Sequence, residues 1–344
     1  MSRSDIGRRE LFRWGAAAAA GLVAARLDGN EPYLPSATRE IPRNPKTAQA
    51  MPTRNLGRTD HLVGIFSLGA QASIEKPNNE KIALPLIERA LDLGVNYIDT
   101  SARYGGDGRW SERYLGQVMK KRRNEVFLAS KTHDRTRDGS LRHLDISLML
   151  LVTDRLDLWQ LLIMQMMEYF DKVCAKGGAL EAFLKARDQG LVRYLGITGH
   201  ADPDVLMEGI RRFPFDTVLM AFNAADPQHR SFRKLLSYAV GKEMGIIGMK
   251  VPARSRLLTT FTPPPNTSAS SPKLVPGTLT MQEAMRYVLS FPFSTVIIGC
   301  DTIAQLEANV GIARNFRPFN QDQLAAIEAK AKPVAEQSLT FRKK

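Results

Sequence analysis

Three residues that can hold and transfer a proton stand near the ends of two consecutive apolar runs. Asp99 and Tyr104 lie in the stretch NYIDTSARYG, and Lys131 ends the next run, VFLASK. A tyrosine has an ordinary pKa of about 10, which makes it a poor acid at neutral pH. A neighbouring ammonium would stabilise the phenolate and lower that pKa, and a carboxylate would hold the ammonium in place. The trio therefore predicts a proton donor suited to a developing alkoxide.

Each residue alone has a simpler interpretation, as a helix-capping Asp, a surface Tyr or a solvated Lys. The functional interpretation requires a fold that brings the ends of neighbouring strands together. In a (β/α)8 barrel the carboxyl ends of the strands converge on one site. Joint placement at adjacent strand ends therefore favours the proton-transfer hypothesis.

The chain beyond residue 53 alternates between short apolar runs and amphipathic helical segments, which favours an α/β fold, a single-domain (β/α)8 TIM barrel. A doubly wound open sheet is the alternative. It normally shows a glycine fingerprint after its first strand, and the cluster GGDG at 105–108 lacks that spacing. The predicted strands are residues 63–68, 95–99, 126–130, 157–163, 192–197, 216–221, 245–249 and 294–298.

The first 29 residues resemble a twin-arginine-type signal peptide. The pair Arg8 and Arg9 precedes an alanine-rich apolar run, and small residues at 23–25 fit a cleavage site. A stray arginine pair before an alanine-rich helix is the simpler alternative. The signal predicts periplasmic or otherwise exported protein, folded before it meets the export machinery, with no membrane span in the mature chain. Residues 30–52 are expected to be a Pro-rich linker, 53–334 the barrel and 335–344 a basic C-terminal tail.

The charge composition limits the classes of partner that we expect the protein to bind. The chain of 344 residues has a formal net charge of +13, but its Lys and Arg residues are spread along the sequence. Nucleic-acid binding requires a clustered basic patch. The charge therefore predicts a basic surface that could favour an anionic cofactor, and no nucleic-acid partner.

From about residue 53 to about 330 the chain resembles the aldo-keto reductases. The similar segments occur in order: YIDTSARYG followed by SERYLG, then LASK, LDLWQLL, GLVRYLGITGH and TVIIGCDTIAQLEANV. The resemblance implies a nicotinamide-dependent carbonyl reductase, usually with NADPH and without a metal. It assigns Tyr104 as the acid, Lys131 as the partner that tunes its pKa, and Asp99 as the anchor of Lys131.

The resemblance breaks at a fourth catalytic position. The family has a histidine in a motif like DLYQLH, where this chain reads DLWQLL and has Leu162. Loss of one hydrogen-bond donor to a reacting oxygen costs roughly 10²–10³ in rate in other enzymes. The enzyme is then slow or uses an activated carbonyl, or the chemistry is lost, or another histidine substitutes. His200 ends the fifth strand, and His133 would share the side of Lys131 if its strand persisted.

A metal site built from His200, Asp202 and Asp204 is a further possibility. The stretch ADPD is more simply the N-terminal cap of a helix with favourable charge, so no metal is expected.

Cofactor contacts are also implied by the resemblance. Thr198 and Gly199 replace the usual Ser-Asn pair, Met249 falls near the position that stacks on the nicotinamide, and Lys250, Arg254 or Arg256 could hold a phosphate. NADP is expected, and NAD is possible because neither residue 299 nor 305 is basic. The predicted cofactor-binding residues are Thr198, Asn223, Met249, Lys250, Gly299, Thr302, Gln305 and Asn309.

Two functions follow. The first is an exported NAD(P)(H)-dependent oxidoreductase that acts on a small carbonyl or sugar-like substrate. The alternative, motivated by Leu162, is a catalytically impaired binding or accessory protein on the same barrel.

Overall fold

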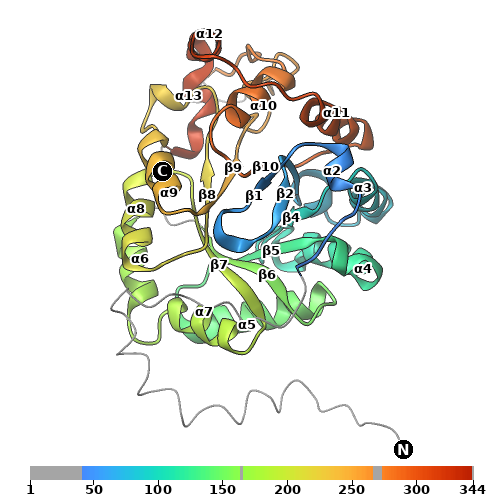
Figure 1. The fold of residues 1–344 in the computed structure, drawn as a ribbon, viewed down its shortest axis with the longest axis vertical. Coiled ribbons are helices and arrows are strands. Elements are labelled where there is room, and N and C mark those ends of the chain that lie inside the picture. Colours follow the sequence, from blue (N-terminus) through green and yellow to red (C-terminus); the bar gives the residue numbers. More distant parts are fainter. Residues whose placement is uncertain (1–40, 163–165, 266–272, 343–344) are drawn as a thin grey trace, which may run out of the picture.

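Eight parallel strands close into a barrel in the computed structural model, which describes residues 41–162, 166–265 and 273–342 (Figure 1). The predicted signal at residues 1–29 lies outside these described residues. Consecutive strands are neighbours around the barrel and the last pairs with the first, which confirms the (β/α)8 prediction. The strands are β3 (Phe66–Gly69), β4 (Tyr97–Asp99), β5 (Phe127–Thr132), β6 (Leu156–Leu161), β7 (Val192–Gly199), β8 (Thr217–Ala221), β9 (Gly245–Met249) and β10 (Thr295–Ile298).

The predicted first strand at 63–68 contains parts of two strands. Its beginning belongs to β2 (Leu62–Gly64), which pairs antiparallel with β1 (Thr53–Asn55), and its end belongs to β3. The hairpin lies across the N-terminal end of the barrel (Figure 1). Leu56 and Val63 are buried there in the barrel-interior cluster, and the ring of His61 stacks on Phe127 at 4.5 Å between centroids. An unbroken apolar run did not reveal the bend between the two strands.

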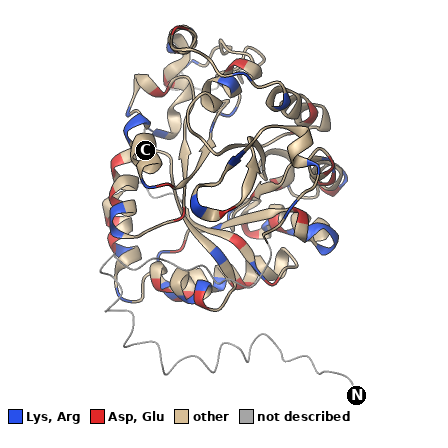
Figure 2. Ribbon diagram, viewed as in Figure 1, with Lys and Arg blue, Asp and Glu red and all other residues tan. Residues whose placement is uncertain are grey.

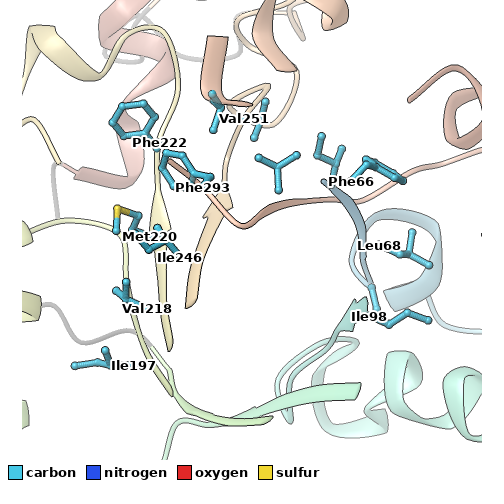
Figure 3. Close-up of a cluster of buried hydrophobic side chains, with 14 of the residues drawn as sticks. Phe66, Leu68, Ile98, Ile197, Val218, Met220, Phe222, Ile246, Val251 and Phe293 are labelled. Atoms are coloured by element: carbon cyan, nitrogen blue, oxygen red, sulfur yellow. The ribbon is translucent and has the colours of Figure 1, made fainter. Parts of the chain in front are cut away.

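Helices form a ring around the strands because each presents one apolar face to them. Outward-pointing strand residues such as Ile197, Val218 and Met220 pack beneath this ring (Figure 3). Lys and Arg are interspersed with Asp and Glu along the helices (Figure 2). None of the helices in the described part of the chain is long and apolar enough to cross a bilayer. The helices are α2 (Thr47–Ala50), α3 (Glu80–Asp92), α4 (Trp110–Arg122), α5 (Arg137–Leu150), α6 (Met167–Cys174), α7 (Ala179–Asp188), α8 (Pro203–Arg212), α9 (Arg233–Gly241), α10 (Met281–Leu289), α11 (Ile303–Arg314), α12 (Gln321–Ala331) and α13 (Ala335–Ser338).

Inward-pointing residues alternate with these outward ones because successive strand side chains face opposite sides. The barrel-interior cluster runs from Leu56 and Val63 at the hairpin end to Ala221 and Met249 at the ends of β8 and β9. Its full membership is Leu56, Val63, Tyr97, Phe127, Ala129, Leu158, Tyr194, Leu219, Ala221, Ile247, Met249 and Ile297. Asp99 and Lys131 continue the inward series beyond Tyr97 and Ala129, at the C-terminal mouth of the barrel.

Residues 335–342, predicted as part of a basic tail, are folded onto the barrel. They form α13 and a short 3-10 helix (Thr340–Arg342). Phe341 packs against the barrel-interior cluster, and Arg342 is 1% exposed. The described part of the predicted linker also contains α2, whose Thr47 and Ala50 are buried.

Candidate active site

The carboxylate and the ammonium of the predicted trio form a buried ion pair. Strands β4 and β5 are adjacent and parallel, with Asp99 opposite Ala129, so Asp99 and Lys131 both point inward near the mouth. Lys131 Nζ donates to Asp99 Oδ1 and, at 2.7 Å, to the carbonyl of Thr100. Each side chain of the pair is 1% exposed. Burial lowers the pKa of Lys131, and the charge of Asp99 opposes that shift.

A residue with no predicted role completes this pair. Gln160 of β6 stands opposite Lys131 in the sheet register. Its amide Nε2 donates to Asp99 Oδ2 at 3.0 Å, so Asp99 accepts from both Lys131 and Gln160. Gln160 could have been predicted from its position two residues before Leu162, because residues two apart in a strand point to the same side.

Tyr104 lies beside this pair on the loop after β4. Lys131 Nζ is 5.1 Å from the centroid of its ring, which is the geometry of a cation–π contact. The backbone N–H of Tyr104 donates to the carbonyl of Ser101 at 3.0 Å, which holds the turn. The structure thus brings together the three residues that the sequence singles out.

The expected lowering of the Tyr104 pKa is wrong. Burial raises that pKa well above its ordinary value, the charges of Asp99 and Glu75 raise it further, and Arg254 opposes them. Lys131 faces the ring, with its Nζ 5.1 Å from the centroid, but its charge does not outweigh these effects. The phenol is therefore held protonated, as a donor needs to be, and is not poised as a phenolate.

Leu162 stands at the position where the family resemblance implies a histidine, so the mouth lacks a polar side chain there. It directly follows β6, its side chain is 4% exposed, and its N–H donates to the carbonyl of Thr132 at 2.8 Å. Its own carbonyl accepts from Arg135 Nη2 at 2.9 Å. An apolar side chain at this point offers no proton or hydrogen bond to a substrate oxygen.

The two histidines proposed as replacements have different surroundings. Strand β5 ends at Thr132, so the condition for His133 to share the side of Lys131 is not met. The ring of His133 packs against His143 of α5, with 4.5 Å between centroids. The structure thus places His133 against the outer helix layer, and it does not support the predicted role of substrate polariser.

His200 stands at the mouth, directly after β7. Its ring meets Phe341 edge-on, with 6.3 Å between centroids. Burial first, and then the charges of Lys250, Arg254 and Lys131, lower the pKa of His200 to about 3. The imidazole is therefore neutral at physiological pH and retains one N–H donor.

The alternative metal site at the same loop is a helix cap. Asp202 Oδ1 accepts from the backbone N–H of Asp204 at 2.9 Å, and Pro203 opens α8. Arg230 also forms an ion pair with Asp202, with 3.4 Å between Nη1 and Oδ2. Within the described residues no group of three potential His, Cys, Asp or Glu ligands gathers.

The predicted nicotinamide contacts lie on the β7–β9 side of the mouth. Thr198 is fully buried, and its hydroxyl has no hydrogen-bond partner among the described residues. Met249 belongs to the barrel-interior cluster. Asn223 Nδ2 donates to the carbonyl of Lys250 at 3.1 Å, so its amide nitrogen already has a hydrogen-bond partner within the protein. Burial first, and then Arg254, lowers the pKa of Lys250 to about 8.

The predicted adenosine contacts gather at the N-terminus of α11, next to Gly299 at the end of β10. Thr302 caps this helix by accepting from the N–H of Gln305 at 3.2 Å, and Gln305 Oε1 accepts from the N–H of Asp301 at 2.8 Å. Asn309 Nδ2 donates to Cys300 Sγ at 3.4 Å. A helix N-terminus attracts phosphate, and the orphaned hydroxyl of Thr198 offers a hydrogen bond. These residues fit a dinucleotide.

The C-terminal segment is part of the mouth, which the sequence did not predict. Phe341 contacts the cluster that contains Met249, and Arg342 forms an ion pair with Asp226 in which both side chains are 0% exposed. The composition FRKK resembles a solvated tail, and only the aromatic Phe341 hinted otherwise. Two shallow surface hollows lie at the hairpin end, lined by residues such as Arg54 and Arg58, away from this mouth.

Comparison with known proteins agrees with this geometry. Residues 62–332 match the model of the aldo/keto reductase family. The chain is 25% identical to the oxidoreductase YqkF of Bacillus subtilis over 314 residues, covering 82% of this chain and 97% of that protein. It is 27% identical to L-galactose dehydrogenase of Arabidopsis thaliana, covering 82% and 94%. An aldo-keto reductase from Bacillus halodurans in its holo form has a similar fold, with a TM-score of 0.67, 23% identity and coverage of 82% and 97%.

Proposed function

Because this chain belongs to the aldo/keto reductase family, we propose that it is an NAD(P)(H)-dependent oxidoreductase that reduces an aldehyde or ketone. The observation that carries the proposal is the placement of Tyr104 over the buried Lys131–Asp99 pair.

Carbonyl reduction adds a hydride to carbon and a proton to oxygen. When bound, a reduced nicotinamide supplies the hydride. Tyr104 supplies the proton to the substrate oxygen, since its raised pKa keeps the phenol protonated until an alkoxide develops. Lys131 faces the phenol ring and stabilises the phenolate that remains, while Asp99 holds Lys131 in place.

His200 is the residue best placed to take over part of the role of the missing histidine. It is neutral and stands at the same mouth, where its ring contacts Phe341 edge-on. A neutral imidazole can donate one hydrogen bond to the carbonyl oxygen and polarise it.

NADP(H) is the proposed cofactor. Thr198 and Met249 would contact the nicotinamide end, Lys250 and Arg254 are cations on the neighbouring loop, and the N-terminus of α11 would meet the adenosine end. NAD(H) stays an alternative, since neither residue 299 nor residue 305 is basic.

Export is proposed from the N-terminal sequence. The order of arginine pair, apolar run and small residues supports translocation of the folded protein to the periplasm. Replacing Arg8 and Arg9 together by Lys should leave the uncleaved chain in the cytoplasm, as measured by cell fractionation. A mature protein that still reaches the periplasm would contradict the route.

Turnover is tested by following NADPH oxidation with purified protein and a panel of aldehydes, ketones and sugars. Tyr104→Phe is the control, because it removes the proton and keeps the ring. Oxidation by the wild type above this control supports the proposal. No difference across the panel would contradict it.

A second function, as a binding or accessory protein, is favoured by Leu162 alone. Calorimetry with NADPH and the substitution Leu162→His separate the two. A histidine there should raise kcat by roughly 10²–10³ if the rest of the site is competent. Tight NADPH binding without turnover, in both the wild type and Leu162→His, would support the accessory function.

A further inference from the structure

Side chains from three strands donate to the carboxylate of Asp99. Lys131 Nζ of β5 donates to Oδ1, whereas Oδ2 accepts from Gln160 Nε2 of β6 at 3.0 Å and from the hydroxyl of Tyr97 of β4 at 3.4 Å. All four residues are buried. The two carboxylate oxygens therefore have separate partners, and the donors on Oδ2 fix which oxygen faces Lys131.

The amide of Gln160 is directed at this carboxylate. Among the described residues its one hydrogen-bond partner is Asp99, and its buried Oε1 has none. Gly196 of β7 stands opposite Gln160 in the sheet register, and a Cβ at that glycine would lie 2.8 Å from Gln160 Cγ. The absence of a side chain at Gly196 thus leaves room for the long side chain of Gln160. A change of this amide therefore acts on the site through Asp99.

We propose that Gln160 is a positioning residue for the proton transfer: its donation to Asp99 Oδ2 keeps Oδ1 on Lys131. The ammonium thereby stays charged and faces the phenol ring of Tyr104. This inference rests on the proposed function. Hydrogen bonds donated to a charged group favour its charged form. Without the amide, the buried pair would lose part of the support for its two charges, and the ammonium would release its proton more readily.

Other ionisable groups surround the pair and form the background of its titration. Burial first, and then Asp99, raises the pKa of Tyr97 well above its ordinary value, so this second phenol stays a donor. The charge of Glu112 on α4 favours the ammonium of Lys131. The groups that interact by charge with the pair or with Tyr104 are Glu75, Tyr97, Glu112, His200, Lys250 and Arg254. Substitutions of Gln160 leave all of them in place.

Two substitutions of Gln160 test the proposal, with NADPH and an aldehyde that the wild type reduces. Gln160→Met keeps the length of the side chain and removes the donor. Its kcat should fall by about 10- to 100-fold, the size expected for one hydrogen bond to a charged group. The decline of kcat at high pH should also begin at a lower pH than in the wild type, because the ammonium is lost earlier.

Gln160→Glu makes the donor dependent on pH. The introduced acid can donate to Asp99 only while it is protonated, and two ionised carboxylates at this distance repel each other. Its kcat should therefore approach that of the wild type at low pH and fall as the pH rises. Gln160→Met should be impaired at every pH.

Two further variants serve as controls. Gln117→Met changes an exposed side chain of α4 and should keep both the rate and the pH profile. Tyr97→Phe removes the longer hydrogen bond to Asp99 and keeps the ring that stacks on Phe127, so it should cause a smaller loss of the same kind. It tests the donors on Oδ2 even if Gln160→Met fails to fold.

NMR separates this inference from the proposed function. Protein labelled with 13C at the lysine Cε atoms reports the protonation of Lys131, whose signal is assigned by its loss in Lys131→Met. The titration midpoint of Lys131 should be lower in Gln160→Met than in the wild type. If no aldehyde is reduced, the proposed function fails, and a lower midpoint still supports the role of Gln160.

Several results would overturn the inference. One is a titration midpoint of Lys131 that does not move in Gln160→Met. Another is an unchanged kcat in Gln160→Met, or a loss that lies mainly in the KM for NADPH. A third is a Gln160→Glu enzyme that matches Gln160→Met at every pH, since the amide would then act by shape and not by donation.

Discussion

Two buried ion pairs stand toward the same end of the barrel, and they differ in the cation. Asp99 pairs with Lys131 between β4 and β5, whereas Asp226, after β8, pairs with Arg342 near the end of the chain. All four side chains are excluded from solvent. The first pair has a titratable ammonium against the ring of Tyr104, whereas the second has a guanidinium that binds backbone carbonyls.

The hydrogen-bond partners explain the difference. Besides Asp226, Arg342 donates to the carbonyls of His229 at 2.7 Å, Ala221 at 3.0 Å and Arg230 at 3.2 Å. A guanidinium stays charged and offers several fixed donors, which suits it to tying segments together. An ammonium is a compact charge whose pKa shifts on burial, which suits it to stabilising a phenolate. The comparison predicts that one pair governs rate and the other governs stability.

The largest effect should come from Lys131→Met. Loss of the ammonium leaves the phenolate of Tyr104 without stabilisation, and kcat for carbonyl reduction should fall by roughly 10²–10⁴. Steady-state NADPH oxidation measures this. Lys120→Met on the exposed face of α4 is the matched control. An unchanged kcat in Lys131→Met would remove this pair from catalysis.

Asp226→Asn should affect stability instead. It leaves a buried guanidinium without its counter-charge, and the free energy of unfolding should fall by about 3–5 kcal/mol. Urea unfolding followed by fluorescence measures it, with the exposed Asp322→Asn as control. The comparison would break if Asp226→Asn lost activity as severely as Lys131→Met while remaining folded.

Arg342→Lys is a smaller change of the same kind. It preserves the positive charge but loses the forked donors to several carbonyls, which should cost about 1–3 kcal/mol of unfolding free energy. Urea midpoints of this variant and of Arg342→Met would separate charge from donor geometry. Equal losses in both variants would mean that the charge alone contributes nothing measurable.

The last prediction is a pH dependence of stability at Lys250. Its folded pKa is about 8 against an ordinary 10.5, so between these values the unfolded state binds more protons and stability rises with pH. Below about 8 the penalty is complete. Lys250→Met should therefore be more stable than the wild type at neutral pH, and this advantage should shrink as pH rises toward 10.5. Urea unfolding across this range, with the exposed Lys242→Met alongside, would show parallel curves if the shift were absent.

Several parts of the site could be predicted from local pattern. Strand parity alone places Asp99 and Lys131 on the inward side, because side chains alternate along a strand. Helix caps such as Asp202 and Thr302 also follow from residue type and position. The alternation of apolar runs and helical segments was sufficient to predict the barrel, but it did not reveal the bend after Gly64.

Other parts depend on chain segments that are distant in sequence. His133 and His200 each follow a predicted strand, and only the actual end of β5 at Thr132 turned His133 toward α5. The direction of the Tyr104 pKa depends on burial and on the positions of Asp99, Glu75 and Arg254, none of which the neighbouring residues reveal.

The sequence by itself determined the order of strands and helices and the inward positions of Asp99 and Lys131, because these follow from periodicity and residue type. It also indicated the family, through the ordered resemblance of its segments. Only the tertiary structure decided which histidine stands at the mouth, that the phenol stays protonated, and that Phe341 and Arg342 belong to the barrel. The physical reason is that burial and Coulomb interactions depend on distances between segments, and those distances exist only once the barrel has closed.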